Sequence, residues 1–434
     1  MLETGARGEI TQQSYGAFSL ALHQRLRRQG TPSNVTIELT RRCPLACAHC
    51  YNNLPMDDTA ARQGELTQPD LSRIFDELAD MGCLWLLLTG GEILARKDFI
   101  EIYAGAKRRG FIITLFTNGT LITPRIADYW AEWRPFSIEI TLYGRTRETY
   151  EALTGVPGSY DRCLRGIHLL KERSLPVKLK TVAVTINKHE IWDMKRFAEE
   201  ELGLPFKFDA LMSPRIDCSQ SPLAVRLSPE EVVALDLGDP QRVREWQEFA
   251  AQFNGPVNPP ERSDDVYHCG GGQGSFAIDP EGRMSICVLS HRDTYDLKAG
   301  SVRDGWEQFL TPVRRKKQTI KTKCTRCHIK AMCGMCPANG ELENGDPERP
   351  VEFLCHTAHL RALAFDIQVP EHGVCEYCDG GMYHESIVEA AGSLRSGQAL
   401  EAPPLTPKAT LLPMLATAAS AGAGCGSGGC SSCH

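Results

Sequence analysis

The chain has 434 residues, of which 42% are hydrophobic, so it is long enough for two or three domains with sizeable cores. Its formal net charge of −6 gives no reason to expect a nucleic-acid partner. No apolar stretch reaches the roughly 20 residues of a membrane span, and charged residues stand near the N-terminus where a signal peptide would be apolar. We therefore predict a cytoplasmic protein with no membrane partner, in which 18 cysteines serve metal ligation rather than disulfides.

Strands and helices alternate along the first half of the chain. Residues 1–33 contain one predicted helix, about Tyr15 to Arg28, that leads into the first strand. Strands are then predicted at 34–40, 84–88, 111–116, 136–142, 177–185 and 206–211, and helices from Thr67, from Asp98, and at 123–132, 159–173 and 189–201. Six such repeats within 34–215 predict a parallel sheet with helical crossovers.

The loop after the first strand reads Cys43-Pro44-Leu45-Ala46-Cys47-Ala48-His49-Cys50-Tyr51. Three thiols at these spacings can ligate three irons of an iron–sulfur cube and leave the fourth iron without a protein ligand. A closed zinc site would normally take four protein ligands, and a zinc or redox loop is the alternative. The strand at 84–88 leads into Gly90, Gly91 and Glu92. The two glycines let the backbone approach a ligand closely, and the carboxylate can hold an ammonium group.

Together these motifs resemble the radical S-adenosylmethionine (SAM) superfamily. The resemblance implies an α/β fold in which 34–215 form an open partial (β/α)6 barrel, with the active site at the carboxyl ends of the strands. It implies that Cys43, Cys47 and Cys50 hold a 4Fe-4S cluster whose open iron is chelated by SAM. An electron from the cluster would then cleave SAM to a 5′-deoxyadenosyl radical, which abstracts hydrogen from a substrate.

The same resemblance supplies candidates for the SAM pocket. The motif Gly90, Gly91 and Glu92 would grip the methionyl end of SAM. Residues 140–144 (ITLYG) resemble the family's fourth-strand segment, so the Thr141 hydroxyl would lie near the SAM ribose, while Tyr143 replaces the usual acid. A strand end and its turn is the alternative for the further candidates, Asn118 and Glu139.

A second cysteine pattern follows a bridging segment, 216–265, which reads as less regular and rich in proline and charge. It resembles the SPASM domain of radical SAM maturases, which implies a small cysteine-rich domain over 266–370 with two auxiliary iron–sulfur clusters. The gap between Cys333 and Cys336 is one residue shorter than in that pattern. A pair of zinc sites is the alternative. The seven cysteines of the pattern are Cys269, Cys287, Cys324, Cys327, Cys333, Cys336 and Cys355.

The family arrangement also implies how these cysteines divide. One cluster would be closed by Cys324, Cys327, Cys333 and Cys355. The other, either open or completed by a further residue, would be held by Cys269, Cys287 and Cys336. Segments 275–278 and 284–288 read as a hairpin with a Pro-Glu-Gly turn. Among isolated cysteines, Cys83 and Cys163 read as buried small hydrophobes, and Cys218 is a candidate to complete the open cluster.

The C-terminal part of the chain carries further cysteines. Cys375-Glu376-Tyr377-Cys378 lies in an extension, 371–396, with one short helix at about 384–394, and is either a metal or cluster ligand or a redox pair. Residues 397–434 read as a flexible tail, because Ala, Pro, Gly and Ser dominate without an apolar period. Three roles stay open for the tail: an end without a specific role, an arm that recruits a soft metal, or a segment modified in cis. Its potential ligands are Cys425, Cys430, Cys433 and His434.

The resemblance implies an enzyme, a maturase that makes an oxidative change in a peptide or protein and takes electrons from a donor such as flavodoxin or ferredoxin. Formylglycine formation in a sulfatase is disfavoured, because Val288 follows Cys287 where an acid is expected. Two alternatives stay open. One is a cofactor-biosynthesis enzyme acting on a small molecule such as a tetrapyrrole side chain, and the other is a non-enzymatic iron–sulfur carrier or scaffold.

Overall fold

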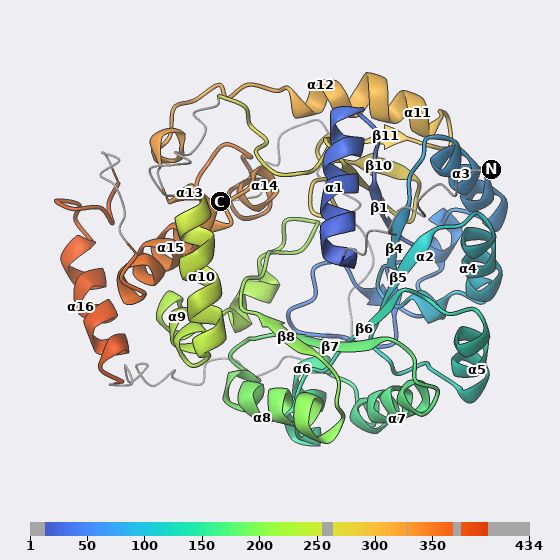
Figure 1. The fold of residues 1–434 in the computed structure, drawn as a ribbon, viewed down its shortest axis with the longest axis horizontal. Coiled ribbons are helices and arrows are strands. Elements are labelled where there is room, and N and C mark those ends of the chain that lie inside the picture. Colours follow the sequence, from blue (N-terminus) through green and yellow to red (C-terminus); the bar gives the residue numbers. More distant parts are fainter. Residues whose placement is uncertain (1–13, 254–263, 328, 368–374, 398–434) are drawn as a thin grey trace, which may run out of the picture.

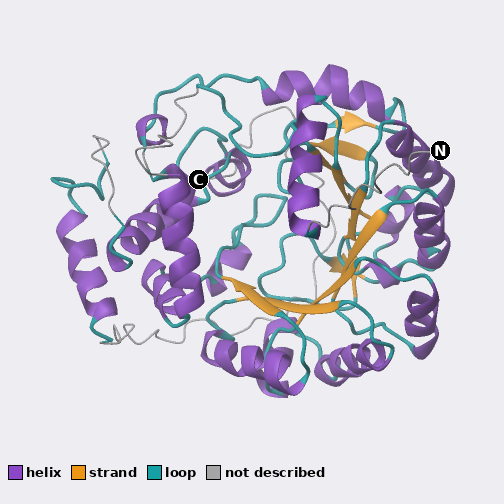
Figure 2. Cartoon of the chain, in the orientation of Figure 1, coloured by secondary structure: helices purple, strands orange, loops and turns teal. Residues whose placement is uncertain are grey.

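The computed structural model describes residues 14–253, 264–327, 329–367 and 375–397. It contains one sheet of nine strands in the order β11-β10-β9-β1-β4-β5-β6-β7-β8 (Figures 1 and 2). The strands are β1 (Asn34–Glu38), β4 (Trp85–Thr89), β5 (Ile112–Thr117), β6 (Ser137–Thr141), β7 (Val177–Val182), β8 (Phe206–Asp209), β9 (Ser275–Ile278), β10 (Arg283–Ser285) and β11 (Tyr295–Asp296). A separate two-stranded ladder joins β2 (Arg42–Cys43) to β3 (Leu54–Pro55).

The six strands β1 and β4 to β8 are parallel and follow one another across the sheet, which confirms the predicted partial barrel. Because β8 and β11 stand at the two ends of the strand order, the barrel is open within the described residues. Figure 1 shows the sheet curving, with helices along its outer side. These are α3 (Gln68–Asp80), α4 (Phe99–Arg108), α5 (Pro124–Glu132), α7 (Ser159–Glu172) and α8 (Ile191–Arg196).

Local sequence explains why these elements form where they do. Thr67 caps α3, with Asp70 completing the capping box and Pro69 in the first turn, and the apolar face of α3 is buried. In β1, Val35 and Ile37 are buried, and Ile37 pairs with Leu88 of β4 on one side and with Ile278 of β9 on the other. The predicted N-terminal helix is confirmed as α1 (Tyr15–Arg28), and the predicted strands and helices of the barrel are confirmed with small shifts at their ends.

Two features of the barrel were not predicted. Helix α6 (Arg147–Thr154) lies between β6 and α7, capped by Thr146 at its start and ended by Gly155 at φ +68°. The hairpin β9–β10 was expected within a separate small domain, but β9 pairs in parallel with β1 and extends the barrel sheet. The first strand is therefore an interior strand of the sheet, with neighbours from both halves of the chain.

The prediction of an irregular bridging segment is wrong for residues 229–253. They form α9 (Pro229–Leu237) and α10 (Pro240–Phe253), because Ser228 and Glu231 make a capping box and Pro229 and Pro240 occupy first helical turns. Val233 of α9 joins an apolar cluster with Leu360 and Ala391 of two C-terminal helices. Those helices are α15 (Glu352–Ala364) and α16 (His384–Arg395), and α16 confirms the predicted C-terminal helix.

A buried ion-pair cluster ties α9, α10 and α15 together. Asp236 of α9 is 1% exposed and accepts hydrogen bonds at 2.9 Å from Arg361 of α15 and at 2.6 Å from Arg242 of α10. Arg361 is itself 2% exposed, so its charge depends on this carboxylate for compensation.

The described residues also contain shorter helices: α2 (Thr59–Gly64), α11 (Val302–Asp304), α12 (Thr311–Arg314), α13 (Lys330–Cys333) and α14 (Pro337–Asn344).

Among the helices of the described ranges, none has both the length and the apolar character needed to cross a membrane. Residues 398–434, with Cys425, Cys430, Cys433 and His434, lie outside the described part of the chain.

We predict that Asp236→Ala lowers the free energy of unfolding by about 3–5 kcal/mol, because it leaves Arg361 buried without its counter-charge. Denaturant unfolding followed by circular dichroism measures the change. The matched control is Asp76→Ala, which removes an exposed ion pair with Arg109 and is expected to leave stability almost unchanged. Equal stability of the two variants would contradict a dependence of the fold on the Asp236 cluster.

Candidate active site

The three cysteines Cys43, Cys47 and Cys50 lie in one loop that begins at the carboxyl end of β1. The loop is closed at its base by the β2–β3 ladder, which pairs Cys43 with Pro55. The unpredicted helix α6 holds its middle, since the Ala46 and Ala48 amides donate to the Thr154 and Leu153 carbonyls at 2.9 and 3.0 Å. Those carbonyls belong to the last turn of α6, where no intrahelical donor remains for them.

Arg215, beyond the last barrel strand, holds the far end of the loop. Its guanidinium donates to the Cys50 carbonyl at 3.1 Å and to the Asn53 carbonyl at 2.9 Å. Next to it, the Ile216 amide donates to the Tyr51 carbonyl at 3.0 Å. No motif in the sequence marked Arg215, because its partners, two backbone carbonyls and the Asn53 side chain, lie more than 160 residues earlier in the chain.

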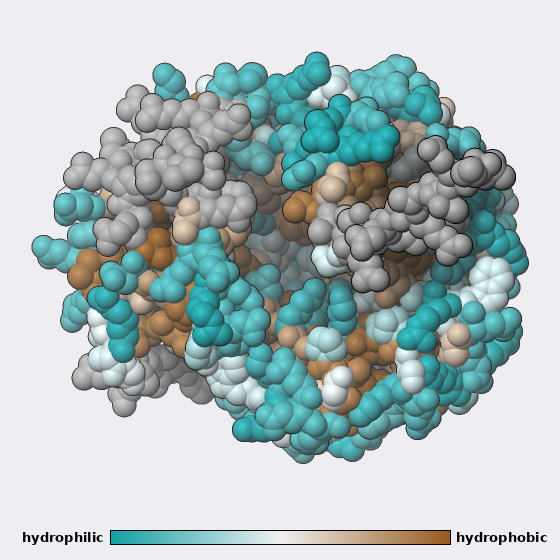
Figure 3. Space-filling model, in the orientation of Figure 1, coloured by the Kyte–Doolittle hydropathy of each residue, from teal (hydrophilic) through white to brown (hydrophobic). Residues whose placement is uncertain are grey.

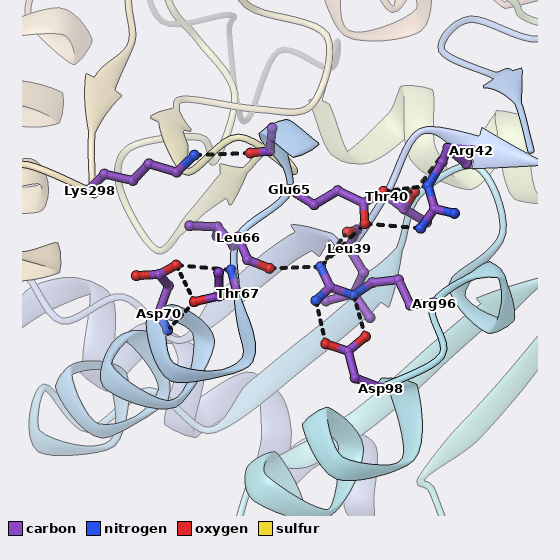
Figure 4. A network of polar contacts seen from close by, with 11 residues as sticks. Leu39, Thr40, Arg42, Glu65, Leu66, Thr67, Asp70, Arg96, Asp98 and Lys298 are labelled. Carbon is purple, nitrogen blue, oxygen red and sulfur yellow. Dashed lines mark hydrogen bonds and ion pairs between the residues drawn. The ribbon is translucent and has the colours of Figure 1, made fainter. Parts of the chain in front are cut away.

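A buried polar network anchors the start of the loop (Figure 4). The Arg42 guanidinium makes a bidentate ion pair with the Glu65 carboxylate, at 2.8 and 3.0 Å, and the Thr40 hydroxyl also donates to that carboxylate. Arg96 donates to the Leu39 and Leu66 carbonyls at 3.2 and 2.9 Å and pairs with Asp98 at 2.7 Å (Figure 4). The network joins the end of β1 to the segment before α3 and to the start of α4.

Gly90 and Gly91, which follow β4, pack against the backbone of residues 40–42 at the start of the cysteine loop. The Gly91 amide donates to the Thr40 carbonyl at 2.6 Å, and the Glu92 amide donates to the Arg42 carbonyl at 3.0 Å. A Cβ atom at Gly90, where φ is +143°, would lie 2.2 Å from the Thr40 oxygen, and one at Gly91 would lie 2.4 Å from the Arg41 oxygen. The close approach that we expected toward a ligand is therefore, in this structure, an approach to the chain's own cysteine loop.

Glu92 is fully buried and links three elements of the site. Its carboxylate accepts from the Thr117 hydroxyl at 2.7 Å, from the Asn118 amide at 2.7 Å and from the Leu94 amide at 3.2 Å. Burial raises its pKa above the usual range for a glutamate. The Asn118 side chain in turn donates to the Cys43 sulfur at 3.5 Å. The structure thus brings Glu92 and Asn118 to the cysteine loop.

The thiols themselves are in an environment that disfavours charge. Burial raises the pKa of Cys43 to about 12 and holds those of Cys47 and Cys50 above their usual value, and the thiols also act on one another electrostatically. Thiolates form here when a bound cation supplies compensating charge. Three soft sulfur donors at one centre fit the irons of an iron–sulfur cluster.

The remaining pocket candidates, Glu139 and Thr141, both lie on β6. Glu139 is paired with Lys180 at 3.3 Å and with Lys207 at 3.2 Å. Burial alone would raise its pKa, but these two ammonium groups hold it below the usual range. Thr141 is the last residue of β6 and is half-buried, and within the described residues its side chain makes no hydrogen bond to the cysteine loop.

Two residues beside the cysteine loop were not predicted as site residues: Tyr143, which the sequence marked only as a departure from the family pattern, and His49. Tyr143 and the Cys47 thiol act on each other electrostatically, so the residue that replaces the family's usual acid lies beside the cysteine loop. The ring of His49 packs edge-on against Tyr143, with centroids 5.4 Å apart. Burial lowers the pKa of His49 to about 4, which keeps the imidazole neutral at physiological pH.

The seven further cysteines fall into two groups in space. Cys269, Cys287 and Cys336 act on one another electrostatically, as do Cys324, Cys327 and Cys333. Cys355 lines one cavity with the second group, together with His359 and Cys375. The isolated Cys83 and Cys163 are buried, as predicted, and Cys218 is buried in a loop with φ +65°.

We predict that Gly91→Ala destabilises the protein by about 1–3 kcal/mol and lowers the iron bound by the cysteine loop, since its Cβ would clash with the Arg41 carbonyl. Unfolding free energy and iron content of reconstituted protein measure the two effects. Gly105→Ala in α4 is the control, because its Cβ would meet nothing closer than Arg109 at 3.5 Å and alanine favours the helix. Indistinguishable behaviour of the two variants would contradict the tight packing of Gly91.

Comparison with known proteins matches one family model and several curated relatives. Residues 37–199 match the model of the radical SAM superfamily. An "AdoMet-dependent heme synthase" of Methanosarcina barkeri is 26% identical over 73% of this chain and 94% of its own length. A "PqqA peptide cyclase" of Bradyrhizobium diazoefficiens is 28% identical over 77% of this chain and 90% of its own length.

Solved structures share the fold. SuiB of Streptococcus suis, bound to the precursor peptide SuiA, superimposes with a TM-score of 0.58 at 17% identity, over 82% of this chain and 84% of that one. The enzyme anSMEcpe with bound AdoMet superimposes with a TM-score of 0.57 at 14% identity, over 85% of this chain and 98% of that one. The family uses a 4Fe-4S cluster and SAM, which fits the three-thiol loop and the Gly-Gly-Glu segment packed against it. Residues 37–199 therefore form a radical SAM domain, and the chain is an enzyme.

Proposed function

We propose that this enzyme makes an oxidative change in a peptide or protein substrate. Cys43, Cys47 and Cys50 hold the 4Fe-4S cluster, which when bound supplies the electron that cleaves SAM to a 5′-deoxyadenosyl radical. The segment Gly90–Glu92 forms the wall next to the methionyl end of SAM. The observation that carries the proposal is the convergence of Cys43, Asn118 and Glu92 at the carboxyl edge of the barrel.

Three further pocket roles belong to the proposal. Asn118 is closest to the cluster loop, with its side chain on the Cys43 sulfur. Thr141 stands at the carboxyl end of β6, where its hydroxyl would meet the SAM ribose. Glu139, held charged by Lys180 and Lys207, would contribute to the polarity of the barrel wall.

A peptide substrate is supported by the relatives and by the open barrel. The PqqA peptide cyclase relative covers most of this chain, and the fold is shared with SuiB bound to its precursor peptide. Within the described residues β8 and β11 are not paired, so the sheet does not close around the site. Figure 3 shows a hollow near the middle of one face, between the regions that α10 and α1 occupy in Figure 1. An extended chain needs an opening of this kind.

A tetrapyrrole is the second candidate substrate. Three AdoMet-dependent heme synthases match 73–76% of this chain and most of their own length. The carrier alternative is not supported, because the chain is an enzyme.

We also propose that the C-terminal cysteines hold two auxiliary clusters. The spatial division of the seven SPASM-like cysteines supports two auxiliary clusters, one near Cys269 and one near Cys324. They would carry away an electron after substrate oxidation or bind the substrate directly.

We propose a small electron-transfer protein such as flavodoxin or ferredoxin as the electron donor. We also propose a cytoplasmic location, in keeping with the cysteine content.

We predict that the wild-type enzyme forms 5′-deoxyadenosine from SAM under anaerobic conditions with a reductant, whereas the variant with Cys43, Cys47 and Cys50 all changed to Ala forms none. The variant should lose about four irons per chain, one cluster's worth, because the remaining cysteines are untouched. Cys83→Ala is the control, since this buried thiol is isolated from the site. Cleavage of SAM by the triple variant would rule out the cluster assignment.

Mass spectrometry after anaerobic turnover separates the two substrates. With a candidate precursor peptide that is a substrate, we expect a product that has lost two hydrogen atoms, together with 5′-deoxyadenosine in equal amount. A porphyrin offered in a parallel reaction should stay unchanged. A change in the mass of the porphyrin side chains, with the peptide unaltered, would overturn the peptide proposal in favour of the tetrapyrrole one.

A further inference from the structure

The Cys-x-x-Cys segment at 375–378 is brought next to α15, although it lies outside the SPASM-like pattern. His359 of α15 has its Nε2 atom 3.6 Å from the Cys375 sulfur and 3.5 Å from the Cys378 sulfur. One turn earlier on the helix, Cys355 completes the group, and the ligand atoms of Cys355, His359 and Cys375 all lie within 4.8 Å of one another.

These separations match one tetrahedral metal ion. With Zn–S near 2.3 Å and Zn–N near 2.0–2.1 Å, tetrahedral geometry places a ligand sulfur and a ligand nitrogen about 3.6 Å apart. Thiolates bound to different irons of one cube lie farther from one another than ligands of a single ion. The spacing therefore indicates a mononuclear centre rather than an extension of a cluster.

His359 is already oriented as a ligand. Its Nδ1 atom lies 2.8 Å from the Cys355 carbonyl oxygen, an acceptor, which fixes Nδ1 as the protonated nitrogen. Nε2 is then the nitrogen with a lone pair, and it faces Cys375 and Cys378. A hydrogen bond from the second ring nitrogen to a backbone carbonyl is the usual support of a metal-bound histidine.

The turn at residues 375–381 is stabilised by hydrogen bonds of its own and by ion pairs to α15. The Cys378 amide donates to the Cys375 carbonyl at 3.2 Å, and the Gly381 amide donates to the Cys378 carbonyl at 2.7 Å. A Cβ at Gly381 would lie 2.5 Å from the Cys375 oxygen, so the turn accommodates only glycine there. Lys323 bridges Glu376 within the turn and Glu352 in the first turn of α15, at 2.8 and 2.7 Å. This ion pair holds the turn against the helix that carries the other two ligands.

We propose that Cys355, His359, Cys375 and Cys378 form a closed site of three thiolates and one imidazole for one zinc ion. The site lines the same cavity as Cys324, Cys327 and Cys333, so it stands directly beside the second auxiliary cluster. It takes Cys355 out of the set that the SPASM resemblance assigns to that cluster, which leaves three cysteines for the cluster and one iron open. Four protein ligands make the zinc structural, and its role is to fasten the turn before α16 to α15.

Metal analysis of anaerobically purified full-length protein, combined with zinc X-ray absorption, tests the proposal. We expect one zinc per chain in addition to iron, with three sulfur neighbours and one nitrogen neighbour. The double variant Cys375→Ser, Cys378→Ser should lose the zinc and keep its iron, and Cys324→Ala, Cys327→Ala should lose iron and keep the zinc. His359→Ala should lose zinc, whereas His359→Cys should retain it with four sulfur neighbours.

The outcomes separate the two kinds of site. Loss of about four irons from the Cys375→Ser, Cys378→Ser variant, with no zinc in the wild type, would make these residues cluster ligands and overturn the proposal. Wild-type protein grown with zinc that contains none would overturn it as well, even if the variants failed to fold. Cys163→Ala, which removes an isolated buried thiol, should change neither metal. Because the readout is metal content, a failure here leaves SAM cleavage and substrate choice untouched.

Discussion

Three thiols crowded into one short loop impose the electrostatic constraint on which this structure depends. Burial and mutual repulsion make the charged forms of Cys43, Cys47 and Cys50 unfavourable, so the triplet gains its function only with a bound cation. The barrel holds the backbone of the loop in place and does not neutralise the charge of the thiolates. The carbonyls that end α6, the glycine segment after β4 and the guanidinium of Arg215 each bind a different part of the loop. The cluster that we propose for these thiols would therefore meet a site whose geometry is set beforehand.

The position of β1 connects this site to the rest of the chain. The strand that leads into the loop pairs with β4 on one side and with β9 on the other. Arg41, in the loop's first turn, forms ion pairs at 3.2 Å with Asp279 and Glu281 in the turn after β9. The cysteine-rich C-terminal half is thus continuous with the strand that bears the catalytic loop. Sheet hydrogen bonds and a half-buried ion-pair group therefore hold the two halves of the chain together.

Features of the fold and the site could be predicted where residues close together in the sequence determine them. The capping chemistry at Thr67, the alternation of the barrel strands and the cysteine spacings are local, and they predicted the barrel and the cysteine loop. The packing of β9 on β1 joins segments from opposite halves of the chain, and nothing in either strand encodes it. Helix α6 was missed because its eight residues lack a long apolar period, yet its last carbonyls hold the loop. Arg215 and the meeting of His359 with Cys375 depend on tertiary proximity, which spacing does not reveal.

The central claim is that SAM binds the open iron of the cluster held by the Cys43 loop. Electron–nuclear double resonance of the reduced enzyme, with SAM labelled by nitrogen-15 at its amino group and oxygen-17 at its carboxylate, tests this directly. The account predicts hyperfine coupling from both labels to one cluster in the wild type, and its loss when Cys43, Cys47 and Cys50 are replaced by Ala. A cluster signal from this loop that SAM leaves unchanged, or coupling that survives in the triple variant, would contradict it.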